Sequence, residues 1–190
     1  MEDGAIIELY WQRKEEAIEE TSQKYGRYLG SIAMNILHHV DDADECVNDT
    51  YVKTWHALPP NRPHSLSAFI GKIVRNLSIN RYRKNVAAKR GGGEMALLLD
   101  ELEDCIPAVE SAEAAFEREG ERTVIATSIS RFLRKLDADS RNIFIRRYWY
   151  ADSIQAIAQR YQASESKIKS QLFRQRNKLR LHLEKEGIQL

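Results

Sequence analysis

The sequence predicts an all-α protein of two small helical domains joined by an acidic linker, with a helix-turn-helix in the second domain. Apolar residues recur at helical spacing along nearly all 190 residues, and the alternation typical of strands is absent. A glycine-rich and then acidic stretch starting at residue 91 interrupts this periodicity. We therefore expect a first domain over residues 1–90, a linker over 91–118 and a second domain over 119–190.

The charge of the chain changes sign in four blocks. Residues 1–60 carry 5 basic and 12 acidic side chains, and residues 61–90 carry 8 and 0. Residues 91–130 carry 2 and 10, and residues 131–190 carry 14 and 6. The formal net charge of +1 conceals this pattern. Two basic blocks separated by an acidic one indicate two surfaces for a polyanion such as DNA.

The composition argues against a membrane or secreted protein. No apolar run approaches the ~20 residues that a membrane-spanning helix needs, so we expect no membrane insertion. The chain opens with acidic residues, whereas a secretory signal opens with basic and then apolar ones. Cys46 lies at an apolar helical position and is expected to be a buried core residue rather than half of a disulfide. These features predict a cytoplasmic protein.

Four helices are expected in the first domain. Apolar spacing predicts the first over residues 5–21 and the second over residues 24–38. A third is expected to begin at Asp41 or Asp42, because carboxylates favour a helix start.

The prolines in residues 58–63 make that stretch a loop. Ser65 is expected to cap the fourth helix, which continues to about residue 84.

The linker and the start of the second domain are less regular. The segment Leu97–Leu99 is too apolar to be wholly solvated, which leaves open whether it docks on a domain. Helical periodicity resumes near Val109 and continues to Leu136, and Asp137 or Asp139 is expected to begin the next helix.

The stretch from Asp152 to Leu183 has the layout of a helix-turn-helix. Asp152 and Gln155 resemble a capping box at the start of a short helix. Gln162 stands in the turn where a positive φ is expected, a conformation for which glycine is more common. Ser164 is expected to cap the longer second helix.

Two helices carry the candidate DNA-binding side chains. Short polar groups and long cations suit base edges and phosphates respectively. In the first domain the candidates are Arg75, Asn76, Asn80, Arg81, Arg83 and Lys84, in a stretch without any acid between Arg62 and Arg90. In the second they are Ser164, Ser166, Lys167, Lys169, Ser170, Gln171, Arg174 and Arg176. The plainer interpretation of each is a solvated basic face.

The acidic run over residues 41–49 allows three interpretations. It could be a capping and solvated helix face, a docking face for a basic protein partner, or a metal site. His38 and His39 precede the carboxylates, but no further histidine lies at ligand spacing, which argues against a metal. No other cofactor is indicated.

Several stretches together resemble the extracytoplasmic-function sigma factors of bacterial RNA polymerase. Residues 41–55 and 69–84 are similar to conserved region 2 of that family, and residues 136–148, 153–158 and 164–176 are similar to its region 4. The resemblance covers nearly the whole chain apart from the linker, and both regions occur in the family's order.

The resemblance implies a function that needs no catalytic residue. It implies that the first domain binds the β′ clamp helices of core RNA polymerase and takes up the minus-ten promoter element with its fourth helix and the 58–65 loop. The second domain would read the minus-thirty-five element and touch the β flap, and a separate anti-sigma protein would control the chain. The polymerase-binding residues implied are Asp44, Glu45, Asn48, Asp49 and Lys53.

Two other classes of function stay open at this point. One is a helix-turn-helix transcriptional regulator that does not bind polymerase, and the other is a metal-dependent nucleic-acid enzyme that uses the carboxylates of residues 41–49. We also expect weak DNA binding by the free chain, because the acidic block competes with phosphate for the basic surfaces.

Overall fold

The computed structural model of the chain describes residues 1–88, 95, 98–99, 101 and 119–188. The chain divides into two compact units, Met1–Gly91 and Gly92–Leu190. Every regular element among the described residues is a helix, which confirms the predicted all-α class. None of these helices is long and apolar enough to cross a membrane.

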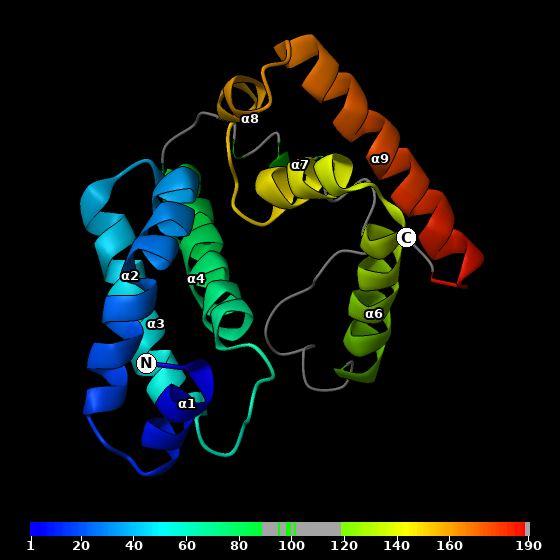
Figure 1. The fold of residues 1–190 in the computed structure, drawn as a ribbon. Coiled ribbons are helices and arrows are strands. Elements are labelled where there is room, and N and C mark those ends of the chain that lie inside the picture. Colours follow the sequence, from blue (N-terminus) through cyan, green and yellow to red (C-terminus); the bar gives the residue numbers. More distant parts are fainter. Residues whose placement is uncertain (89–94, 96–97, 100, 102–118, 189–190) are drawn as a thin grey trace. The chain divides into compact units, whose positions relative to one another are not determined.

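The first unit contains α1 (Asp3–Trp11), α2 (Glu16–Leu37), α3 (Val40–Ala57) and α4 (Leu66–Ala88) (Figure 1). Helices α2, α3 and α4 pack against one another, and α1 packs on α2. Each contributes an apolar stripe to one core, whose fully buried members include Ile6, Tyr10, Leu29, Ile32, Ile36, Leu58, Leu66 and Ile70. Cys46 is buried in this core, as its position in the sequence predicted.

The division between the first two helices differs from the prediction. The break lies over residues 12–15 and not at residues 22–23, and Arg13 adopts a left-handed φ of 55° there. The reason is tertiary: the Tyr10 hydroxyl lies 2.9 Å from the Thr21 hydroxyl, so α1 folds back onto α2. Thr21 and Ala17 are buried on the same face of α2, and the helix continues without a break through Thr21.

The starts of the next two helices also follow from local contacts. The N-cap of α3 is His39, whose Nδ1 accepts a hydrogen bond from the backbone N–H of Asp42 at 3.4 Å, so neither Asp41 nor Asp42 is the cap. The predicted cap of α4 is present, because Ser65 Oγ accepts from the Ala68 N–H at 3.2 Å. Residues 58–65 are non-helical, as the prolines predicted.

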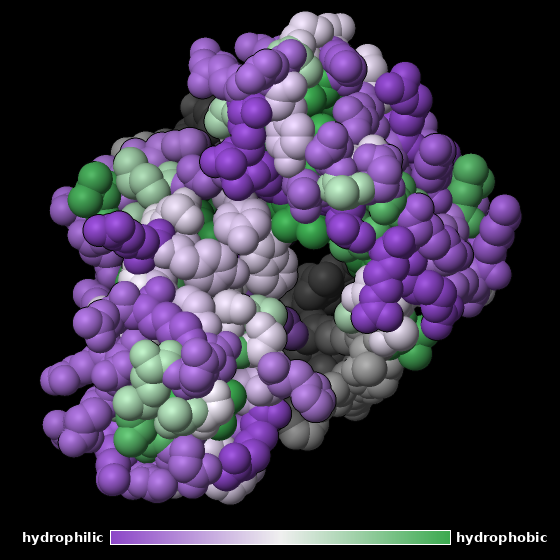
Figure 2. Space-filling view, in the orientation of Figure 1, coloured by the Kyte–Doolittle hydropathy of each residue, from purple (hydrophilic) through white to green (hydrophobic). Residues whose placement is uncertain are grey.

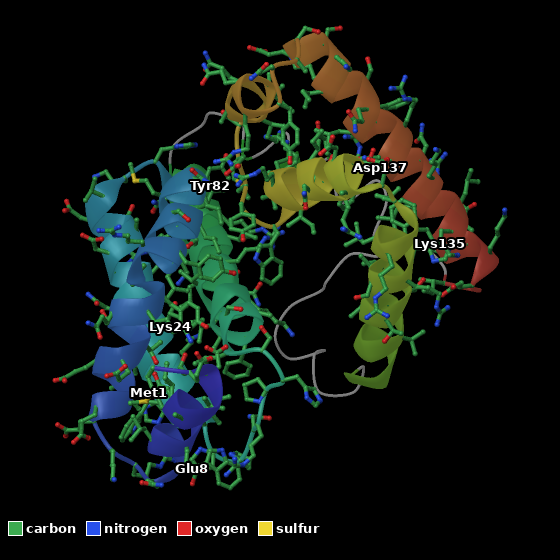
Figure 3. All side chains as sticks on the ribbon, viewed as in Figure 1. Met1, Glu8, Lys24, Tyr82, Lys135 and Asp137 are labelled. Carbon is green, nitrogen blue, oxygen red and sulfur yellow. The ribbon has the colours of Figure 1, made fainter. Side chains whose placement is uncertain are left out.

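The second unit contains α6 (Glu119–Lys135), α7 (Ala138–Tyr148), α8 (Ile154–Arg160) and α9 (Glu165–Lys185). The long helix α9 packs on the other three. Asp137 caps α7 by accepting from the Ser140 N–H at 2.8 Å, and Figure 3 labels it at the junction with α6. The helical periodicity expected from Val109 falls partly on residues 109–118, which lie outside the described residues.

Candidate polymerase and promoter interfaces

The helix α3 separates a buried face from an acidic one. Its buried face consists of Ala43, Cys46, Val47, Thr50, Tyr51 and Thr54. The candidate polymerase-binding residues Asp44, Glu45, Asn48, Asp49 and Lys53 are all exposed. Because positions three and four apart share one side of a helix, these side chains form a single polar face, which we call the α3 face.

The acidic run does not assemble into a metal site. No group of three or more His, Cys, Asp and Glu side chains suited to a metal ion occurs in the part of the chain that the structure describes. His39 caps the helix, and Asp42 contacts two side chains of α4.

The candidate DNA-binding residues on the basic helix α4 differ in their exposure to solvent. Asn76, Asn80, Arg83 and Lys84 are exposed, opposite the buried Leu66, Ile70, Val74 and Ile79. Arg75 is only partly exposed, and desolvation by burial lowers the pKa of its guanidinium. The helix therefore offers fewer solvated cations than its composition suggests.

Arg81 joins α4 to the α3 face. Its guanidinium forms an ion pair with Glu45 and lies 3.7 Å from Asp42 Oδ1. Asn85, one turn further along α4, donates from Nδ2 to Asp42 Oδ2 at 3.0 Å. The hydrogen bond from Arg81 to Glu45 raises the pKa of the guanidinium. Arg81, a candidate promoter-binding residue, is thus paired with Glu45, a candidate polymerase-binding residue.

The helix-turn-helix has the predicted layout, with one change in its capping. Ser153, and not Asp152, caps α8 by accepting from the Ala156 N–H at 3.0 Å. Asp152 Oδ2 instead accepts from Arg146 at 2.6 Å, which draws it away from the helix start. Gln162 has the expected positive φ, 50°.

The start of α9 also follows the prediction. Ser164 Oγ accepts from the Lys167 N–H at 3.2 Å. Ile168, Leu172, Leu179 and Leu183 are buried and hold α9 against the unit.

The first turns of α9 carry the exposed candidates. Ser164, Ser166, Lys167, Lys169, Ser170 and Arg174 are exposed, and the side of α9 visible in Figure 2 is mostly hydrophilic. Gln171 is partly covered, because its amide donates to Ser140 Oγ at 3.0 Å. The exposed candidates of this helix therefore lie in its N-terminal half, where short polar groups and cations are interspersed.

Arg176 lies in a polar cluster that sequence reasoning missed. Its Nη1 donates to the Tyr148 hydroxyl at 2.7 Å and lies 3.4 Å from a carboxylate oxygen of Glu101. The Tyr148 hydroxyl donates to the same carboxylate at 3.1 Å, and Arg147, which is buried, lies 3.6 Å from it. The sequence signal was indirect: the apolar residues before Glu101 suggested docking, and Met95 and Leu98 are indeed buried.

Comparison with known proteins matches each half of the chain to a region of the sigma-70 factors. Sigma-70 region 2 matches residues 22–87, and sigma-70 region 4 matches residues 132–181. The chain is also 24% identical over 176 residues to RNA polymerase sigma factor YlaC of Bacillus subtilis (strain 168), covering 90% of this chain and 94% of that protein. A solved structure of CnrH in complex with the cytosolic domain of CnrY is similar, with a TM-score of 0.43 and 21% identity over 96% of this chain and 97% of that one.

The two matched regions together cover more than half of the residues, and the chain belongs to the sigma-70 family of RNA polymerase sigma factors. It is an alternative sigma factor of the extracytoplasmic-function group, which confirms the resemblance drawn from its sequence. Such a factor binds core RNA polymerase and directs it to promoter DNA for melting and initiation, acting as a non-enzymatic transcription factor.

Proposed function

We propose a division of labour among the surfaces described above. The α3 face binds the β′ clamp helices, α4 and the 58–65 loop take up the minus-ten element, and the N-terminal half of α9 reads the minus-thirty-five element. The second unit also touches the β flap. The observation that supports this proposal is that the candidate residues on α3, most of those on α4 and those at the start of α9 are exposed, while an apolar stripe on each of these helices is buried.

Promoter melting in this proposal is a matter of binding energy. Extruding a base from the duplex costs a few kcal/mol, and stacking or pocket contacts return about 1–3 kcal/mol per base. The protein melts DNA by holding the unpaired strand better than the paired one, with the 58–65 loop receiving one extruded base. Exposed Asn80 and Arg83 lie on the helix that follows this loop.

Four further features complete the proposal. The chain acts in the cytoplasm, where its polymerase and promoter are found, and it contributes no catalytic residue. A separate anti-sigma protein controls it by covering one or more of these surfaces. The domains that act are residues 1–90 and 119–190, joined by the acidic linker over 91–118.

The decisive experiment is a pulldown with core RNA polymerase followed by run-off transcription on fragmented genomic DNA. We expect a stoichiometric complex and transcripts that start at a small set of shared sequences, which defines the chain's promoter. A chain that binds DNA but not the polymerase would be a helix-turn-helix regulator. Metal-dependent turnover of nucleic acid that is lost in the Asp44→Asn variant would favour the enzyme.

A further inference from the structure

The 58–65 loop contacts the last turn of α1. Trp11 Nε1 donates to the backbone carbonyl of Asn61 at 3.2 Å. Arg62 places its guanidinium carbon 4.2 Å from the centre of the Trp11 ring. Its Nη2 donates to Glu8 Oε2 at 2.9 Å, and this hydrogen bond is the main cause of the lowered pKa of Glu8. Two side chains of one helix thus hold the side chain and the backbone of the loop.

The helix that provides these contacts is itself firmly anchored. Ile6 and Tyr10, on the other side of α1, are fully buried. The Tyr10 ring packs edge-on against Trp55, with 6.2 Å between ring centroids. Just after α1, Arg13 donates to the carbonyl of Trp55 at 2.6 Å. Because Trp55 lies in the last turn of α3, α1 fixes both the entry to the loop and its tip.

We propose that Glu8 and Trp11 are positioning residues for promoter melting: they hold Arg62 and the 58–65 loop in the conformation that receives the unpaired base. This inference rests on the proposed role of the loop. A guanidinium stacked on an indole and bonded to a carboxylate has few orientations left. A loop ordered before DNA arrives spends none of its binding energy on becoming ordered.

The position of these contacts argues for such a role over a purely structural one. The side chains of Glu8 and Arg62 are 48% and 55% exposed, and an exposed ion pair contributes little to global stability. The unit retains its core contacts through Ile6 and Tyr10 without them. Figure 3 labels Glu8 on α1, close to the 58–65 loop.

The test measures how holoenzyme reconstituted with each variant binds a single-stranded minus-ten oligonucleotide of the mapped promoter. Trp11→Ala is expected to weaken binding roughly tenfold, because the ring and the indole donor are both lost. Trp11→Phe keeps an aromatic ring but lacks the indole N–H, and it is expected to recover part of this loss. Glu8→Gln is expected to weaken binding about threefold, and Glu15→Gln, the same charge change at a residue just beyond α1, is expected to leave it unchanged.

An abasic site placed at each oligonucleotide position in turn separates positioning from general weakening. At the position whose base the loop receives, the abasic site should weaken binding of the wild-type holoenzyme. The same abasic site should not weaken binding of the Trp11→Ala holoenzyme any further, because the substitution and the abasic site remove the same interaction. If the losses add at every position, or if Trp11→Ala binds like the wild type, the inference is wrong. If the wild type is insensitive to every abasic site, the proposed role of the loop itself fails. Thermal unfolding and core-polymerase affinity of the variants serve as folding controls.

Discussion

The helices α4 and α9 carry similar cationic residues but differ in what surrounds them. On α4, Arg81 is bound by the carboxylates of α3, and Arg75 is partly covered and desolvated. On α9, Lys167 and Lys169 at the N-terminal end are exposed, and Lys169 forms an ion pair with Glu165 at 3.7 Å. Charge counted along a sequence therefore overstates what a folded surface offers to DNA, and more so where an acidic helix packs alongside.

The difference suggests distinct conditions for the two surfaces to act. The first turns of α9 carry exposed cations among the described residues of the second unit. Arg81 is held by Glu45 and lies near Asp42, and Glu45 belongs to the α3 face proposed to bind polymerase. The ion pair would then couple polymerase binding to promoter contact within one unit.

The largest effect is expected from removing the polar groups in the middle of α4. In the Asn80→Ala/Arg81→Ala variant, open-complex formation should fall by on the order of 100-fold, because two strand contacts are lost. Core-polymerase binding should not weaken, because every residue of the α3 face is kept. Permanganate reactivity of the promoter measures melting, and Lys72→Ala, an exposed cation on the same helix, is the control. Normal reactivity in the double variant would contradict the role of α4.

A smaller effect is expected from the open cations of α9. For holoenzyme that contains the Lys167→Ala/Lys169→Ala variant, the slope of log affinity for promoter DNA against log salt concentration should be smaller in magnitude by about two. Each lost phosphate contact contributes about one to this slope. Affinity measured over a series of salt concentrations gives the slope. Lys135→Ala/Lys185→Ala removes the same charge elsewhere in the second unit. Equal slopes for the two double variants would mean that the N-terminal half of α9 does not meet the phosphates.

The third prediction concerns Arg176, whose guanidinium lies beside the carboxylate of Glu101. Glu101→Gln removes the carboxylate charge beside Arg176, so DNA binding by the second unit of the free chain should strengthen by a few-fold. Glu184→Gln, which removes an exposed carboxylate on α9, should have a weaker effect. Fluorescence anisotropy at low salt measures both. Identical affinities for the two variants would show that Glu101 does not restrain the DNA-binding surface.

The smallest effect compares two residues with a left-handed backbone, Gln162 and Arg13, with φ of 50° and 55°. Gln162→Gly should stabilise the protein by about 0.5–1 kcal/mol, because glycine adopts this conformation without a Cβ clash. Arg13→Gly gains the same relief but loses the hydrogen bond to the Trp55 carbonyl, so no net gain is expected. Chemical denaturation measures both. A larger gain for Arg13→Gly would mean that its contact with Trp55 contributes nothing.

The sequence by itself determined the helical class, the loop at 58–65, the caps Ser65 and Ser164, and the positive φ in the turn at Gln162, and it narrowed the cap of α7 to Asp137 or Asp139. These are local properties: apolar periodicity, proline, short polar caps and φ preferences act over a few neighbouring residues. It also placed the candidate side chains on their helices, and the match to both sigma-70 regions confirmed the family.

Only the tertiary structure decided which of those side chains are available. The ion pairs of Arg81 with α3, the cluster of Glu101 with Arg176 and the contacts of Trp11 with the 58–65 loop join residues far apart in the sequence. The break between α1 and α2 likewise depends on Tyr10 meeting Thr21. Periodicity shows that a residue lies on a polar face, but the charge opposite that face is set by how the helices pack.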